Sequence, residues 1–102
     1  ISTTIAPQAL MLMNSPNVRG YARKLAGQLT KNAGDDLEKA VITGYEKVLG
    51  REPHEDELLA TLDFLKLQEA SYQEAKQGNP RELALVDFAQ TLLGLNEFSY
   101  LR

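Results

Sequence analysis

The chain has 102 residues, of which 43% are hydrophobic, and this length and composition fit one domain with a modest core. It has no cysteine and one histidine, which excludes disulfides, cysteine nucleophiles and metal or haem sites built on several imidazoles within this chain. Its net charge of −3 combines a basic first third (residues 1–34, net +4) with an acidic remainder (residues 35–102, net −7), a balance that does not favour general nucleic-acid binding.

Two helices are expected in the basic third. The segment "PQALMLM" predicts a short helix over residues 7–13, with Pro7 at its first position, where a missing N–H costs nothing. Ser15 and Pro16 then supply an N-cap and a first-turn residue for a second helix over residues 16–31. Its apolar positions follow the spacing of one helical stripe: Val18, Tyr21, Ala22, Leu25, Ala26 and Leu29.

A third helix is expected over residues 36–49, with Asp35 as its N-cap. Its apolar stripe consists of Leu37, Ala40, Val41, Gly44, Tyr45, Val48 and Leu49. A glycine in the middle of a helix costs roughly 1 kcal/mol relative to alanine. We therefore expect a neighbouring helix to approach closely at Gly44.

The stretch "LGREPHEDEL" at residues 49–58 concentrates groups that could carry chemistry, but helix rules explain most of them. Gly50 fits a C-cap, and Pro53 fits the start of a fourth helix whose first turn is acidic. Arg51 is expected to bind the last carbonyls of the third helix or a carboxylate of the last helix. His54 has no second histidine four residues later, so it is interpreted as solvent-exposed rather than metal-binding.

The fourth helix is expected over residues 53–77 and the fifth over residues 80–94, separated by a Gly78 C-cap, an Asn79 N-cap and Pro80. The fourth helix carries an apolar side formed by Leu58, Leu59, Leu62, Phe64, Leu65, Leu67 and Tyr72. The fifth buries Leu85, Val86, Phe88, Ala89, Leu92 and Leu93, and Phe98 and Tyr100 are expected to dock back from the tail. The fold class is thus all-α, a small single-domain bundle of about five helices with short loops.

Two carboxylates lie between apolar neighbours on these helices. Asp63 follows Leu62 and Asp87 follows Val86, so either could lie at the edge of the core. The preferred interpretation is a boundary salt bridge, for example with Arg51, and the alternative is an acid–base pair with a shifted pKa. Because no catalytic, phosphate-binding or calcium-binding motif is present, we assign no catalytic, cofactor-binding or metal-binding residue.

Three segments together, "PQALMLMNSPNV", "AVITGYEKVLGREPHEDEL" and "LVDFAQTLLGLNEFSYLR", make the chain resemble the C-terminal part of the planctomycete secreted domain-one family, whose function is unknown. The resemblance implies a larger, extracytoplasmic protein whose upstream region often includes cytochrome c-type domains. It also implies that Gly50, Arg51 and Pro53, and Asn96, Glu97 and Phe98, are recurring structural junctions. Where relatives often end in "LNSNEF", this chain has "LGLNEF".

From these patterns we expect a structural or interaction module at the C-terminus of an exported multidomain protein, with no catalysis of its own. The chain starts without an initiator methionine, which suggests a fragment, and its partner would be another domain of the parent chain. The contact surface is predicted around Met11, Met13, Arg19 and Arg23, with no membrane span and no nucleic acid. The alternative is a part of a redox or carbohydrate-directed enzyme completed by upstream domains, with a cleft that collects Arg51, His54 and acids.

Overall fold

The computed structural model describes residues 16–100, with side chains through Asn96, and this part of the chain is all-helical. Its helices are α2 (Pro16–Ala33), α3 (Leu37–Leu49), α4 (Glu55–Glu74) and α5 (Pro80–Tyr100). The all-α prediction is confirmed, but the count of about five is not reached in residues 16–100, which contain four helices. The helix expected over residues 7–13 lies outside the described part.

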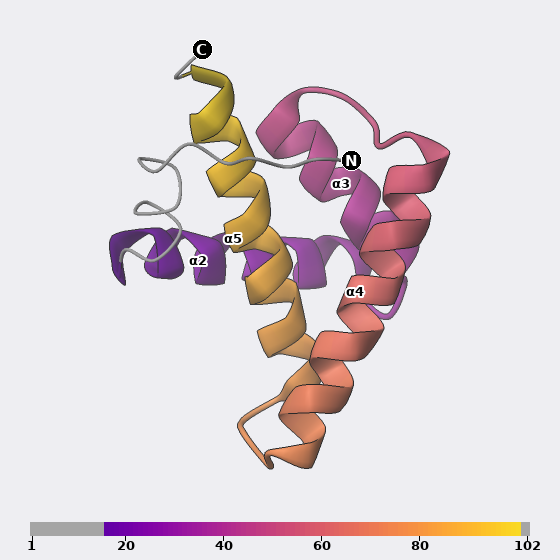
Figure 1. Cartoon of the computed structure of the whole chain (residues 1–102), viewed down its shortest axis with the longest axis vertical. Helices are drawn as coiled ribbons and strands as arrows, with labels where there is room; N and C mark the ends of the chain where they lie inside the picture. The colour runs from indigo at the N-terminus through magenta and orange to yellow at the C-terminus, as the bar shows by residue number, and fades with distance from the viewer. Residues whose placement is uncertain (1–15, 101–102) are drawn as a thin grey trace.

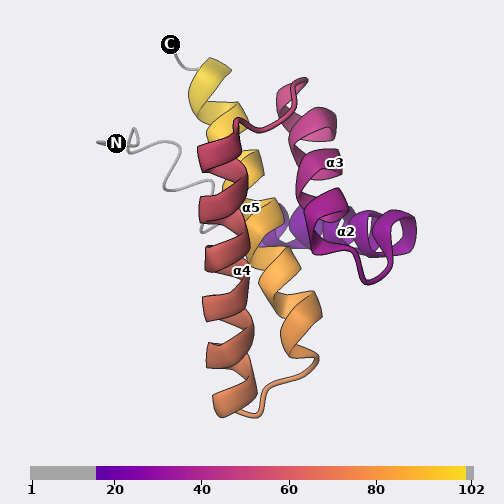
Figure 2. The same ribbon diagram turned by 90° about the vertical axis from the view of Figure 1, so that its right-hand side faces the viewer.

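Helices α4 and α5 form an antiparallel hairpin whose closed end extends away from the rest of the molecule (Figures 1 and 2). Helix α2 crosses α5 at a steep angle, and α3 lies near the opposite, open end of the hairpin. Helices α3 and α5 each pack against the other three helices, but α5 makes the most extensive contacts, mainly with α2 and α4, so it is the central element of the bundle. No helix in residues 16–100 is long and apolar enough to cross a bilayer.

The core lies where α5 meets the other helices. Its largest fully buried side chains are Leu29, Val41, Leu65, Leu85 and Leu92, which come from all four helices. Within the described residues, no polar or charged residue is fully buried. The apolar stripes of α2, α3 and α5 face one another as the sequence spacing predicts, except that Tyr21, which was expected on the α2 stripe, is 64% exposed.

Gly44 explains how α3 and α5 come close. A β-carbon at this position would lie 2.9 Å from Cε2 of Phe88 and 3.0 Å from Cδ1 of Leu92, both on α5. These distances leave no room for a methyl group, so the expected close approach at Gly44 is confirmed. The rings of Tyr45 and Phe88 pack beside this contact, with centroids 6.2 Å apart.

The helix ends follow local capping chemistry, with two corrections to the predicted caps. The N-cap of α3 is Asp36 rather than Asp35, and its carboxylate accepts a hydrogen bond from the backbone N–H of Lys39. Helix α4 begins at Glu55 with His54 as its N-cap, two residues after the expected start at Pro53. The predicted caps at Gly50 (φ 72°) and Asn79, which accepts from the N–H of Glu82 at 3.2 Å, are confirmed.

The lengths of the last two helices also differ from expectation. Helix α4 ends at Glu74 instead of residue 77, since Lys76 already has a positive φ of 55°. Helix α5 continues through Gly94 to Tyr100, where a separate tail was expected after residue 94. No proline and no glycine with positive φ follows Phe88 within α5, so nothing in its backbone stops the helix.

Candidate functional site

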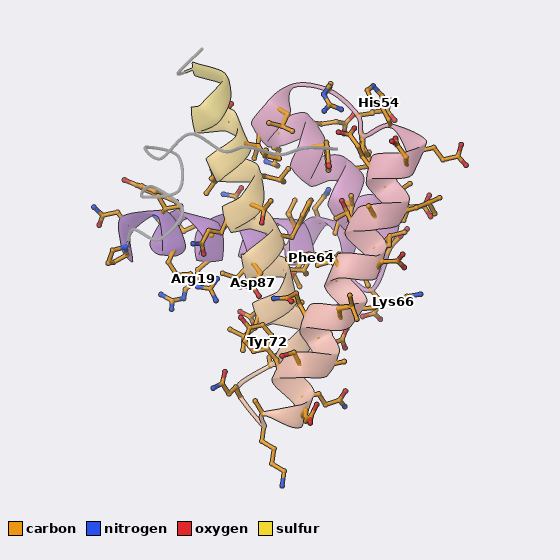
Figure 3. The ribbon with its side chains drawn as sticks, viewed as in Figure 1. Arg19, His54, Phe64, Lys66, Tyr72 and Asp87 are labelled. Atoms are coloured by element: carbon orange, nitrogen blue, oxygen red, sulfur yellow. The ribbon has the colours of Figure 1, made fainter. Side chains whose placement is uncertain are left out.

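A network of polar side chains joins α2, α4 and α5 at Asp87. One carboxylate oxygen of Asp87 accepts from Nη1 of Arg19 at 2.7 Å. The other accepts from Nε2 of Gln68 and from the hydroxyl of Tyr72, both at 2.8 Å. Arg19 also donates to Oε1 of Gln90 at 2.9 Å. Figure 3 shows Arg19, Tyr72 and Asp87 converging from three different helices.

The electrostatics of this network favour a structural role. Burial lowers the pKa of Arg19, but the interactions with Asp87 and Tyr72 together outweigh this effect and raise it. Burial raises the pKa of Tyr72, and the hydrogen bond to Asp87 raises it further. Near neutral pH Arg19 therefore stays charged and the hydroxyl of Tyr72 keeps its proton. Both oxygens of Asp87 then keep their hydrogen-bond donors.

The network corrects one sequence interpretation. Asp87 does form a salt bridge at the core boundary, but its partner is Arg19, 68 residues earlier, and not Arg51. Arg19 is consequently turned toward the core edge, whereas it was expected to belong to a contact surface. Asp63, the other candidate carboxylate, is exposed on α4.

A second polar cluster lies at the α3–α4 junction. Two nitrogens of Arg51 bind the two carboxylate oxygens of Glu57, at 2.8 and 3.0 Å. Oε1 of Glu57 also accepts from the backbone N–H of His54 at 2.8 Å, which closes the first turn of α4. The guanidinium carbon of Arg51 lies 5.5 Å from the ring centroid of Tyr45. Arg51 is thus held by α4 and α3, and neither of its two expected partners is used.

The chemistry of this junction is that of a fixed ion pair. The hydrogen bonds from Arg51 lower the pKa of Glu57 to about 2. A carboxyl group with that pKa is ionised at neutral pH and does not donate a proton there. The side chain of His54 is 75% exposed, with Nδ1 3.4 Å from Oε1 of Glu57. As predicted, it is a solvent-exposed histidine, and Figure 3 shows it where the α3–α4 loop enters α4.

Beside the junction, α3, α4 and α5 enclose a partly open groove of about 240 Å³. Its walls are mainly aromatic and aliphatic, and two carboxylates and two threonines complete the lining. The lining residues are Tyr45, Asp56, Glu57, Ala60, Thr61, Phe64, Phe88, Thr91, Leu92 and Leu95. Phe64 lies between α4 and α5 in Figure 3.

Sequence reasoning missed the groove. Tyr45, Phe64 and Phe88 each lie on the apolar side of a different helix. Their assignment to the core is confirmed for Tyr45 and Phe88, and Phe64 packs against that core, but the spacing did not show that all three also line one groove. The available signal was Phe64, which widens the apolar side of α4 beyond its main stripe and lines the groove. Leu59 and Leu67, which were also counted on that side, are 57% and 70% exposed and do not line the groove.

The other predicted site residues are scattered. Arg23 is exposed on α2, and Gly50 and Pro53 lie on either side of Arg51 at the α3–α4 junction. Asn96 lies half-buried in α5, whose backbone continues through Glu97 and Phe98. Met11 and Met13 lie outside the described residues. In the described part of the chain, no group of three or more metal-ligating side chains comes together.

Comparison with known proteins gives one result. A family model described as a protein of unknown function, PSD1 (DUF1553), matches residues 1–65, which is more than half of the chain. The match covers α2, α3 and the first half of α4, and it ends before α5. No curated protein and no solved structure matches the chain. The chain therefore belongs to the PSD1 family of proteins of unknown function (DUF1553).

Proposed function

We propose that this chain is a helical interaction module at the C-terminus of an exported multidomain protein, with no catalysis of its own. The observation that supports it is the groove, because apolar concave surfaces rimmed by polar groups are typical of binding sites. The proposed partner is another domain of the parent protein. The planctomycete origin, the extracytoplasmic location and the cytochrome c-type neighbours implied by the sequence resemblance belong to this proposal.

The outer face of α2 is a second part of the proposed contact region. Arg23 and Lys24 are exposed, Tyr21 exposes 64% of its surface beside them, and α2 contains no acidic residue. Of the two arginines expected to meet a partner, Arg23 is available and Arg19 is engaged by Asp87. A basic face with an exposed tyrosine complements an acidic surface on a neighbouring domain.

The test compares hydrogen exchange in the 102-residue chain and in the full parent protein. We expect amide protection along α2 or along the groove helices to increase at least tenfold in the parent protein. Equal protection on every surface in both proteins would contradict the proposal. Amides in the core, such as that of Leu85, are the internal control, since they are buried in either case.

A second candidate is a part of an enzyme completed by upstream domains. It is favoured by one observation, the grouping of Arg51, His54 and Glu57 at the edge of the groove that Glu57 also lines. Since the pKa of Glu57 is about 2, this residue would supply charge and not a proton. Alanine substitutions of Arg51 and His54 in the full parent protein test this candidate. If it is correct, each substitution should lower the activity of the parent protein, and unchanged activity would contradict it.

A further inference from the structure

The groove has a shape and a charge distribution that specify a partner more narrowly than the proposed function does. We propose that it binds an apolar helix carrying a lysine or arginine, which meets Asp56 at the acidic end of the groove. This inference rests on the proposed function, because it names the kind of partner that an interaction module with this groove would take.

The lining positions favour a helical occupant. On α4 they fall at residues 56–57, 60–61 and 64, and on α5 at residues 88, 91–92 and 95. Each series covers two helical turns, so the groove runs parallel to both helices for roughly 10 Å. Apolar grooves of this kind between helices receive the apolar face of another helix through anchors spaced by three, four and seven residues.

The apolar part of the groove has room for large side chains. Its volume of about 240 Å³ exceeds the ~150 Å³ of an engineered apolar cavity that accommodates benzene. Phe64 and Phe88 form one end, while Leu92 and Leu95 continue the wall on α5. Helices α4 and α5 run antiparallel (Figure 1), so Asp56 near the start of α4 and Leu95 near the end of α5 both lie at the end of the groove away from the two phenylalanines.

The negative charge at the Asp56 end of the groove favours a basic residue on the partner. The charged residues that line the groove are Asp56 and Glu57, and no basic residue lines it. Arg51 neutralises Glu57 through two hydrogen bonds. Among the described side chains Asp56 has no hydrogen bond or ion pair, and Glu55, which precedes it in the first turn of α4 but does not line the groove, adds negative charge nearby. The partial positive charge of the α4 N-terminus, about half a unit, does not balance two carboxylates.

The experiment titrates the ¹⁵N-labelled chain with two model peptides, an amphipathic Leu/Lys helix and its Leu/Glu counterpart, and follows amide shifts by NMR. We expect the Leu/Lys peptide to shift amides around Ala60, Phe64 and Leu92, and to bind at least tenfold more tightly than the Leu/Glu peptide. Equal binding of both peptides, or shifts confined to other surfaces, would overturn the proposal.

Matched substitutions on α4 separate the groove from general charge attraction. Asp56→Lys should weaken binding of the Leu/Lys peptide at least tenfold, whereas Asp63→Lys, an exposed carboxylate outside the groove, should weaken it less than threefold. Ala60→Trp, which fills the groove, should abolish binding, while Ala70→Trp on the exposed surface should preserve it. Equal effects within either pair would contradict the assignment of the groove.

Two further outcomes identify a different occupant and would also overturn the proposal. If the peptide binds only after residues 1–13 are deleted, the start of the chain itself occupies the groove. If sedimentation shows a dimer that Ala60→Trp dissociates, a second copy occupies it. Failure of this inference can be distinguished from failure of the proposed function. If hydrogen exchange in the parent protein showed added protection along α2 alone, the interaction module would still be supported, but the groove would not be its contact site.

Discussion

Asp87 on α5 accepts hydrogen bonds from side chains of α2 and α4, so its substitution should weaken the packing of all three helices. Asp87→Ala would remove the acceptor of Gln68 and of the Tyr72 hydroxyl, and would leave the partly buried charge of Arg19 with only the neutral Gln90 as acceptor. We expect the free energy of unfolding to fall by about 2–4 kcal/mol, because unsatisfied partners of a charged hydrogen bond are costly. Urea denaturation followed by circular dichroism measures this change.

The matched control is Asp63→Ala, which removes an exposed carboxylate from α4. It should change the free energy of unfolding by less than about 0.5 kcal/mol. If both substitutions had the same small effect, the Asp87 network would not stabilise the fold.

Glu57 makes the stability of the fold depend on pH, and its pKa gives the direction of this dependence. That pKa lies near 2 in the folded protein and at 4.5 for an unperturbed glutamate. The stabilisation by its bonds to Arg51 is therefore complete above about pH 4.5 and is lost as the pH falls toward 2. Because both side chains are partly exposed, we expect it to amount to no more than about 1 kcal/mol.

An NMR titration of the side-chain carboxyl carbon checks the pKa of Glu57 directly. The midpoint should lie near pH 2, and Arg51→Leu should move it upward. Arg81→Leu, which removes an arginine from α5, should leave it unchanged. A midpoint above pH 4 in the unmodified chain would show that the Arg51–Glu57 pair does not form in solution.

At the scale of the element, the spacing of α3 and α5 depends on the absence of a side chain at Gly44. Gly44→Ala would place a methyl group about 3 Å from the buried Phe88 and Leu92. We expect it to lower the free energy of unfolding by about 1–3 kcal/mol, since overpacking outweighs the higher helix propensity of alanine. Thermal and urea denaturation measure the change.

Gly27 in α2 is the matched control for Gly44, because no other helix approaches it closely. A β-carbon there would meet no atom within 4 Å, so Gly27→Ala should raise the free energy of unfolding by about 0.5–1 kcal/mol. Stabilisation by both substitutions would show that α3 and α5 are not in close contact in solution.

The caps that the sequence predicted correctly are decided by a few neighbouring residues, and the close approach at Gly44 followed from the cost of a glycine within a helix. Gly50 and Asn79 act within one turn, so their caps follow from residue type and position. The partner of Asp87 could not be predicted, because the spacing along one helix does not say which of 11 basic residues lies across the bundle. The groove escaped prediction for the same reason, since its aromatic walls at Tyr45, Phe64 and Phe88 come from three helices.

At the scale of the whole molecule, α5 holds the other helices in place. It supplies Leu85 and Leu92 to the core and contacts α2, α3 and α4, although the family match ends before it at Leu65. A chain ending at residue 78 should therefore lack a cooperative urea transition and should bind the dye ANS through its exposed apolar faces. A sharp transition in the shortened chain would show that α2–α4 form an independent unit.

The central place of α5 also has a consequence for biosynthesis. Helices α2, α3 and α4 leave the ribosome first, and their apolar faces have no complete partner until residues 80–96 follow. The unit must then fold largely after α5 has left the ribosome, instead of assembling helix by helix during translation. During that interval the apolar faces of α2, α3 and α4 stay partly exposed to solvent, even though the sequence of each helix alone is sufficient to predict it.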